Sequence, residues 1–347
     1  MPHRQQTELE REIREQPEVL TQREAGSWET ARRAAALLAG ADVFQIVIAA
    51  RGSSDNAGRF AQYLIGSDAR VPVALATPWL YEDERPPLLR GAAVLAISQS
   101  GQSPDVVSVV RAARAQGRPC VAITNDTASP LALAADLVVP LLAGEERSVA
   151  ATKTYLASLH AIAQISTILG NVSGRDGWFA QLPSLARTVV EQQLEERRRF
   201  DRLAQARSLT AVGRGLQLST AYETALKLRE LGGLMGEAFS LPDLLHGPLA
   251  ALRGQGAIWL LSIGRRRQPS AQEFELLRGH AGLSVAVSDH AEVAAAADIG
   301  IQIPELPGWL TPLLAAIPAQ AAGLRLAELR GGDVDRPEGL SKVTLTH

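Results

Sequence analysis

A cluster of small polar residues directly follows the apolar run at residues 92–97. The cluster comprises Ser98, Gln99, Ser100, Gly101 and Ser103. Pro104 comes next and suits the first turn of a helix. Hydroxyl groups, an amide and backbone N–H groups at a helix N-terminus can hold an anion without a lysine. The spacing fits a phosphate site and an ordinary serine-capped turn equally well, and leaves both open.

A second polar loop, formed by Gly52, Ser53 and Ser54, follows the apolar run at residues 43–49 in the same way. Glycine permits a sharp turn or a close approach of the backbone, and the serines offer hydroxyl groups. Ligands of open α/β sheets bind at the carboxyl ends of the strands. Two such loops on neighbouring strands could therefore close around one phosphate, although this loop alone fits a capped turn.

Three charged residues, Glu223, Lys227 and Glu230, are spaced so that they share one face of a predicted helix. Such a set is commonly a ladder of ion pairs on a solvated surface. Leucines flank these charges, however, and a helix with several apolar neighbours can be largely enclosed. An enclosed carboxyl group is suited to accept and return a proton during a reaction.

Two further candidates stand apart from this helix. His246 is followed by Gly247 and Pro248, a rigid turn that would present an imidazole able to assist the opening of a sugar ring. Lys342 lies near the C-terminus and would matter only if the tail folds back into a site. Lys153 follows a polar loop, and we expect it to be a solvated helix residue.

Short apolar runs alternate with amphipathic segments along the chain, which predicts parallel sheets covered by helices on both faces. We expect strands at residues 43–49, 71–76, 92–97, 120–124, 137–141, 209–212, 257–263, 283–287 and 299–303. We expect helices at residues 55–65, 105–115, 219–231 and 312–329, and largely helical structure at 8–40 and 152–206. Runs that end in Arg-Gly at residues 51–52 and 214–215 form a weak internal repeat. The predicted fold is α/β, with two tandem doubly wound parallel-sheet domains in a three-layer αβα arrangement.

The composition limits the classes of function. The formal net charge of −2 gives no overall field for nucleic acid or an anionic membrane. Cys120 is the only cysteine, which excludes a disulfide framework, and its apolar neighbours predict a buried strand. The polar N-terminus and the lack of an apolar stretch of ~20 residues point to a cytoplasmic protein that binds no membrane.

Taken together and in order, these segments resemble the sugar isomerase (SIS) domain family, especially the isomerase half of glucosamine-6-phosphate synthase and its stand-alone relatives. The resemblance begins near residues 12–17 and extends to the tail at residues 333–342. It implies flavodoxin-like domains at residues 41–170 and 206–330. A helical segment at 1–40, a helical linker at 171–205 and a tail at 331–347 that folds into the active site complete the expected organisation.

The resemblance also assigns roles to residues of this chain. It implies Glu230 as the base that moves a proton between C1 and C2, with Lys227 assisting it. It implies His246 for ring opening, reaching in from the second subunit of a homodimer, and Lys342 near the sugar carbonyl, where an imine could form. The residues it implies for substrate binding are Gly52, Ser53, Ser54, Ser98, Gln99, Ser100, Ser103, Val149 and Ala151. It implies neither a metal nor an organic cofactor.

Departures from the synthase pattern decide the expected reaction. Pro2 stands where a glutaminase has its nucleophilic cysteine, so we expect no release of ammonia from glutamine. Residues 102–105 and the tail at 340–344 look more like the stand-alone glucosamine-6-phosphate deaminases. The expected substrate is thus a hexosamine 6-phosphate. The alternatives are an isomerase, aminotransferase or deglycase on another 6-phosphosugar amine, and a sugar-phosphate sensor. The first forty residues are short for the DNA-binding module of such a sensor.

Overall fold

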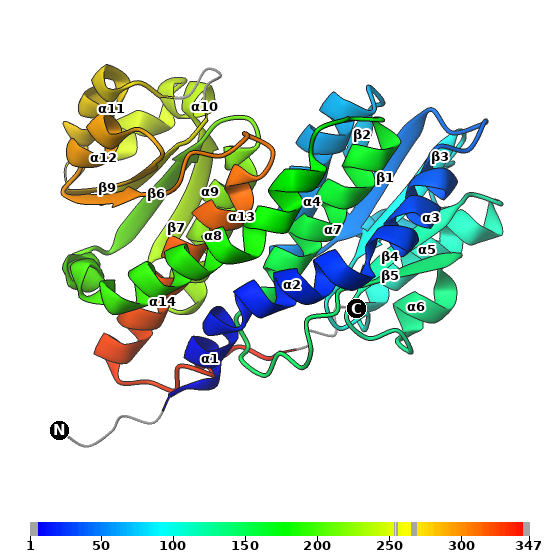
Figure 1. The fold of residues 1–347 in the computed structure, drawn as a ribbon, viewed down its shortest axis with the longest axis horizontal. Helices are drawn as coiled ribbons and strands as arrows, with labels where there is room; N and C mark the ends of the chain where they lie inside the picture. The colour runs from blue at the N-terminus through cyan, green and yellow to red at the C-terminus, as the bar shows by residue number, and fades with distance from the viewer. Residues whose placement is uncertain (1–5, 253, 255, 265–268, 343–347) are drawn as a thin grey trace. The chain divides into compact units, whose positions relative to one another are not determined.

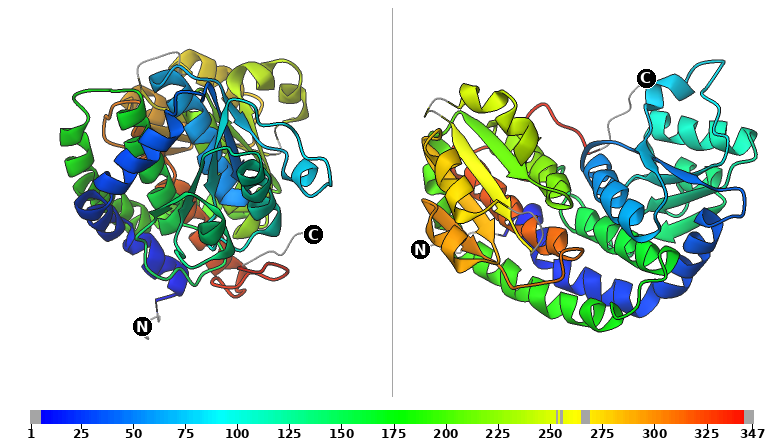
Figure 2. Two further views of the ribbon diagram at one scale, coloured as in Figure 1. Left: turned by 90° about the vertical axis from the view of Figure 1, so that its right-hand side faces the viewer. Right: turned by 90° about the horizontal axis from the view of Figure 1, so that it is seen from above.

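The computed structural model describes residues 6–252, 254, 256–264 and 269–342. The chain divides into two compact units, each built from several segments. The N-terminal sheet unit comprises Pro17–Glu146, Lys153–Pro183 and the end of the chain from Ser341. The C-terminal sheet unit comprises the start of the chain to Gln16, Arg147–Thr152 and Ser184–Leu340. Figures 1 and 2 show the strands of each sheet lying between helices.

Five parallel strands in the order β2-β1-β3-β4-β5 form the first sheet. They are β1 (Gln45–Ala50), β2 (Val73–Leu75), β3 (Ala92–Ile97), β4 (Cys120–Thr124) and β5 (Leu137–Pro140). Strands β3 and β4 are buried at every position, because parallel strands between two helical layers meet no water. The chain leaves β1 toward β2 on one side and continues with β3 on the other. The switch point of this sheet, where open α/β folds bind ligands, therefore lies between β1 and β3.

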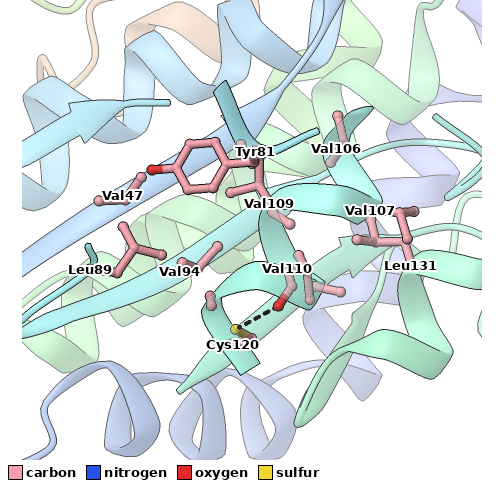
Figure 3. Close-up of a cluster of buried hydrophobic side chains, with 14 of the residues drawn as sticks. Val47, Tyr81, Leu89, Val94, Val106, Val107, Val109, Val110, Cys120 and Leu131 are labelled. Carbon is pink, nitrogen blue, oxygen red and sulfur yellow. Dashed lines mark hydrogen bonds between the residues drawn. The ribbon is translucent and has the colours of Figure 1, made fainter. Parts of the chain in front are cut away.

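Helices cover both faces of the first sheet. One face packs against α5 (Pro104–Ala115), α6 (Pro130–Ala134) and the short helix η1 (Pro78–Tyr81). Figure 3 shows this core, in which Cys120 is fully buried and its thiol lies 3.8 Å from the Val110 carbonyl oxygen. Burial raises the pKa of Cys120 to about 12, so the thiol is unreactive. The other face is covered by α3 (Trp28–Leu38), α4 (Gly52–Asp68) and α7 (Lys153–Leu169).

The second sheet repeats the topology of the first. Its parallel strands have the order β10-β9-β8-β6-β7, in which β6 takes the place of β1 and β8 that of β3. They are β6 (Ser208–Gly213), β7 (Met235–Ser240), β8 (Ala257–Ser262), β9 (Leu283–Ser288) and β10 (Ile299–Gln302). The predicted fold class, two doubly wound parallel sheets, is confirmed.

Helices α10 (Leu241–Leu245), α11 (Ala271–Arg278) and α12 (Ala291–Ala295) pack on one face of the second sheet. On the other face lie α9 (Gln217–Glu230), α13 (Thr311–Ala315), α14 (Ile317–Arg330) and η2 (Arg197–Gln205). There Trp259 of β8 stacks on Phe200 of η2 with ring centroids 6.0 Å apart. The remaining elements are α1 (Glu8–Arg14), α2 (Gln16–Gly26), α8 (Asp176–Glu195) and η3 (Pro248–Ala251).

Among the described residues, no helix combines the length and the apolar character needed to cross a bilayer.

Candidate active site

The loop at residues 98–104 leaves the buried strand β3 and enters α5. The Ser98 hydroxyl oxygen accepts a hydrogen bond from the Gly101 N–H at 3.1 Å, and the Ser100 hydroxyl oxygen accepts one from the Gln102 N–H at 3.2 Å. Gly101 has φ +63°, and a Cβ there would lie 2.0 Å from the Ser129 hydroxyl oxygen. Ser103 occupies the N-cap position of α5, yet its side chain makes no capping hydrogen bond. The Ser103 side chain therefore does not cap α5, whereas the Ser98 and Ser100 hydroxyl groups bond within the turn.

An ion pair joins this loop to the loop after β1. Arg51 Nε lies 2.5 Å from Asp105 Oδ2, and the Asp105 side chain is 2% exposed. Arg51 directly precedes Gly52, which starts α4 with φ +55°. The two loops at the switch point are thus tied together by residues that the sequence analysis did not select. The sequence offered two signals for this pair. Arg51 stands at the end of a predicted strand, and Asp105 stands in the first turn of a predicted helix.

Asn125, at the end of β4, connects Gln99 to the loop after β5. Its N–H donates to the Gln99 carbonyl oxygen at 3.0 Å, and its side-chain amide donates to the Gly144 carbonyl oxygen at 2.7 Å. Its Oδ1 accepts a hydrogen bond from the Ala143 N–H at 3.2 Å. Asn125 was missed by the sequence analysis, although an Asn-Asp pair after an apolar run is a signal for a structured turn.

Glu146, two residues beyond Gly144, is a buried carboxylate that binds the end of the chain. Its Oε2 lies 3.0 Å from Lys342 Nζ, and its side chain is fully buried. The same carboxylate accepts hydrogen bonds from the Thr154 hydroxyl at 2.6 Å and the Thr154 N–H at 3.2 Å. Lys342 is therefore folded back onto the N-terminal sheet unit. Lys153 is only 3% exposed, so the expectation that it is solvated is wrong.

Residues 147–151 are held within the C-terminal sheet unit by the Glu12 carboxylate and the Asp335 backbone carbonyl group. Glu12 of α1 accepts hydrogen bonds from the Arg147 N–H and from both the N–H and the hydroxyl of Ser148. The Val149 N–H donates to the Asp335 carbonyl oxygen at 2.9 Å. Val149 and Ala151 are both partly exposed. Because its N–H is occupied, Val149 could offer a ligand only its carbonyl oxygen.

The charged face of α9 encloses an ammonium group between two carboxylates. Lys227 Nζ lies 2.5 Å from Glu230 Oε2 and 3.6 Å from Glu223 Oε1. Lys227 and Glu223 are fully buried, whereas the Glu230 side chain is 23% exposed. A pocket of about 640 Å³ lies beside this face, lined by Glu230 and Leu226 of α9 and by residues of the tail up to Leu340. Glu230 is thus the member of the set that faces the pocket.

His246 lies at the C-terminal end of α10 and is exposed. Among the described residues its side chain makes no hydrogen bond. Gly247 has φ +146°, a conformation that only glycine adopts readily, so it turns the chain sharply after the histidine. Within the described chain no hydrogen bond or ion pair joins His246 to Glu230, whereas Lys227 and Glu230 are brought together.

Two parts of the chain match one known family. Residues 38–168 and residues 202–328 each match the family model described as "SIS domain". The chain belongs to the SIS domain family. The first SIS domain match contains strands β1 to β5 and the second contains β6 to β10. The repeated topology is therefore the repetition of one domain.

Named proteins resemble the two SIS domains over nearly the whole chain. An isomerizing glutamine–fructose-6-phosphate aminotransferase from Pyrococcus horikoshii is 31% identical over 340 residues, which are 96% of this chain and 56% of the relative. The chain spans about half the length of the curated relatives it matches. The crystal structure of a proposed phosphosugar isomerase from Silicibacter pomeroyi has a TM-score of 0.86 at 29% identity, covering 95% of this chain and 100% of that chain. Glucosamine-6-phosphate deaminase from Thermotoga maritima shares the fold, with a TM-score of 0.79 at 17% identity over 98% of this chain and 100% of that one.

Proposed function

We propose that the chain is a sugar-phosphate enzyme of the isomerase type, which moves a proton between C1 and C2 of a 6-phosphosugar. One observation carries this proposal: Glu230 faces a pocket of about 640 Å³ while its carboxylate is held 2.5 Å from the buried ammonium of Lys227. A fixed carboxylate at a pocket wall suits the abstraction of a proton next to a carbonyl group. The names of the aminotransferase and phosphosugar isomerase relatives support the same class of reaction.

The loops at the switch point of the first sheet would bind the phosphate. In this proposal the N-termini of α4 and α5 supply backbone N–H groups, and the serines at 53, 54, 98, 100 and 103 supply hydroxyl groups. The Arg51–Asp105 ion pair keeps the two loops in register. No metal is required, since N–H groups and a helix terminus stabilise an anion directly.

The finer proposal is deamination of glucosamine 6-phosphate. His246 opens the ring, and Glu230 removes the proton at C2 of the open-chain aminoaldose and returns it to C1. A proton also passes from the nitrogen to the C1 oxygen, and the double bond then lies between C2 and the nitrogen. Water adds to this ketimine, and ammonia leaves, so that one glucosamine 6-phosphate and one water give one fructose 6-phosphate and one ammonia. The segment at 102–105 and the tail at 340–344 support this choice through their resemblance to stand-alone deaminases.

The test measures ammonia and fructose 6-phosphate formed from glucosamine 6-phosphate by the purified chain. The Glu230→Gln variant is expected to lower kcat about 10²–10⁴-fold, the contribution typical of a positioned general base. Glu275→Gln, an exposed change on α11 that breaks only a surface pair with Arg278, serves as the control. Turnover by Glu230→Gln at the rate of the wild type would overturn the role of Glu230.

The same assay separates the alternatives. Formation of fructose 6-phosphate from glucose 6-phosphate, without ammonia from the aminosugar, would identify an isomerase. Release of the free substituted amine, only from N-substituted aminosugar phosphates, would identify a deglycase. Binding of phosphosugars without turnover of any of them would identify a sensor. Each of the three results would contradict the deaminase proposal.

A further inference from the structure

A fully buried arginine in the N-terminal sheet unit forms no ion pair among the described residues. Arg23 of α2 has no exposed surface, and the hydrogen bonds of its guanidinium group all go to uncharged acceptors. Burial lowers the pKa of Arg23 to about 9, so the group is still ionised at neutral pH. A buried charge without an ion partner is costly unless its hydrogen bonds are complete and well placed.

Two of the acceptors belong to the chain that leaves β5. Arg23 Nη1 donates to the Pro140 carbonyl oxygen at 2.8 Å and to the Leu141 carbonyl oxygen at 3.0 Å. Leu142 follows with φ +54°, a left-handed conformation that is unfavourable for a residue with a side chain. Backbone in such a conformation persists only where the surrounding structure fixes it. Arg23 supplies this restraint directly before the turn.

The other two acceptors orient the guanidinium group from α7. Arg23 Nε donates to His160 Nδ1 at 3.2 Å, and Arg23 Nη2 donates to Gln164 Oε1 at 3.2 Å. The Ser27 hydroxyl donates to the same Gln164 oxygen at 2.7 Å. His160, Gln164 and Ser27 are themselves fully buried. Because the guanidinium group is a rigid, planar set of donors, these contacts leave it one orientation.

Asn125 contacts the same turn and connects it to the candidate phosphate loop. Its side-chain oxygen accepts the Ala143 N–H at 3.2 Å, and its side-chain amide donates to the Gly144 carbonyl oxygen at 2.7 Å. The Asn125 N–H donates to the Gln99 carbonyl oxygen at 3.0 Å. A continuous path of hydrogen bonds and backbone thus runs from Arg23 through the turn to the loop. Every residue in this path belongs to the N-terminal sheet unit.

We propose that Arg23 is a positioning residue for phosphosugar binding: it fixes the turn after β5, and this turn, through Asn125, fixes the loop at residues 98–104. The inference rests on the proposed function, because that loop is the proposed phosphate site. Arg23 has no exposed surface, so it touches no substrate itself. Its removal should therefore weaken binding of the phosphosugar while the proton-transfer step continues at nearly its normal rate.

Removal of the guanidinium group tests this role. Arg23→Met places an unbranched apolar side chain in the buried site. We expect it to raise the KM for glucosamine 6-phosphate at least about tenfold while kcat stays within about threefold of the wild type. An unchanged KM, or a loss confined to kcat, would overturn the positioning role. If Arg23→Met does not fold, Gln164→Met removes one acceptor and should raise the KM at least about threefold, and an unchanged KM there has the same meaning.

Arg175→Met is the matched control for the loss of a buried arginine. Arg175 is 8% exposed, and its Nη1 lies 2.6 Å from Oδ2 of Asp68, the last residue of α4. Helix α4 begins beside the phosphate loop and has 17 residues, so this ion pair lies about 25 Å farther along the helix. We expect both arginine variants to lower Tm and only Arg23→Met to raise the KM. Equal rises would show that the effect is a general loss of stability.

A double-variant cycle tests whether Arg23 acts through Asn125. We expect Asn125→Ala to raise the KM for glucosamine 6-phosphate in the wild-type chain and to have little further effect in the Arg23→Met background, because residues that act through one network are not additive. Equal rises from Asn125→Ala in both backgrounds would show that Arg23 does not act through Asn125, and would overturn the inference.

A final measurement needs no substrate, so it holds even if the proposed function fails. Amide hydrogen exchange in peptides that cover residues 98–104 and 141–144 should be at least about fivefold faster in Arg23→Met than in the wild type. Arg175→Met should leave exchange in these peptides unchanged. Unchanged exchange in Arg23→Met would overturn the inference. Failure of the wild type to bind any phosphosugar, with the expected change in exchange, would count against the proposed function alone.

Discussion

The backbone at Gly101 illustrates how one residue shapes the candidate phosphate loop. Its left-handed conformation is unfavourable for any residue with a Cβ, and the Ser129 hydroxyl oxygen occupies the space that a Cβ would need, at 2.0 Å. Ser129 is itself the N-cap of α6, where its hydroxyl accepts a hydrogen bond from the Ala132 N–H. A side chain at position 101 would therefore displace either the loop or the start of α6.

We predict that Gly101→Ala weakens binding of a phosphosugar at least about tenfold and lowers the free energy of unfolding by about 1–3 kcal/mol. Gly117→Ala is the matched control, since Gly117 has φ +67° and no atom within 4 Å of the added Cβ. Titration calorimetry and denaturant unfolding of both variants measure the two effects. Equal effects of the two substitutions would show that the contact with Ser129 contributes nothing.

His160 is a buried histidine that links pH to stability. Its Nδ1 accepts a hydrogen bond from Arg23 Nε at 3.2 Å, Glu24 Oε2 lies 3.8 Å from its Nε2, and Phe179 packs edge-on against its ring. Burial first, and then the charge of Arg23, hold the pKa of His160 well below its usual value. Burial acts on Glu24 in the opposite sense and raises its pKa.

The direction in which pH changes the stability follows from the number of protons that His160 binds in the folded and in the unfolded chain. Below its ordinary pKa of about 6.5 the histidine binds a proton in the unfolded chain but not in the folded one. Stability from His160 is therefore complete above that pH and falls as the pH drops, by at most about 1.4 kcal/mol per pH unit. We predict that His160→Gln flattens the decline of Tm between pH 6.5 and 5.5. His280→Gln, on an exposed residue, should leave the decline unchanged.

At the scale of elements, the link between the loops after β1 and β3 is the feature to test. The Arg51 side chain is half exposed, whereas the Asp105 side chain is buried. Removing the charge of Asp105 therefore leaves a buried polar group at position 105 without its charged partner. We predict that Asp105→Asn raises KM for the phosphosugar about tenfold with little change in kcat. Glu29→Gln, which breaks the exposed pair with Arg32 on α3, is the control. A loss confined to kcat would contradict a role in phosphate binding.

The elements that the sequence predicted are those with an unambiguous pattern. Strands β3 and β4 begin and end at the predicted residues, because a fully buried parallel strand is a continuous apolar run between polar turns. Strand β7 was not predicted. Its sequence contains a glycine and a glutamate, and as an edge strand it has exposed positions that break the apolar pattern. The predicted final helix is divided into α13 and α14.

The site could be predicted only in part, for a physical reason. Local sequence patterns indicate polar loops after strands and charges on one helix face, such as residues 98–103 and Glu230. They do not indicate which distant residues hold those loops in place. Asn125, Glu146 and Asp105 act through contacts with partners 19 to 196 residues away, which no local pattern reports. The burial of Lys153 was mispredicted for the same reason.

At the scale of the whole molecule, two SIS domains of identical strand order make up the two units. Each unit has its own buried apolar core, as a separate domain does. His246 is exposed in the described chain, and we propose that it serves the site of a second copy, as the family resemblance implies. A site of this kind is incomplete in one chain and complete in a symmetric dimer.

Mixing two inactive variants tests this arrangement. Glu230→Gln and His246→Ala, unfolded together and refolded, should recover roughly a quarter of wild-type activity, since random pairing in a two-fold dimer restores about that share of intact sites. Light scattering gives the mass of the assembly in the same preparation. No recovery from a mixture that forms dimers would show that His246 does not act across subunits.

The tail residue Asp335 also has a consequence for synthesis of the chain. Its carboxylate accepts hydrogen bonds from the Glu8 N–H at 3.1 Å and the Leu9 N–H at 2.8 Å, at the start of α1 and up to 327 residues away. Ribosomes add roughly 5–20 residues per second, so α1 waits on the order of tens of seconds for this partner. Its apolar residues Leu9 and Ile13, fully buried in the finished protein, have no native cover in that interval. The nascent chain is therefore expected to depend on holding chaperones at its first helix, and shortening the tail before Asp335 should prolong that dependence.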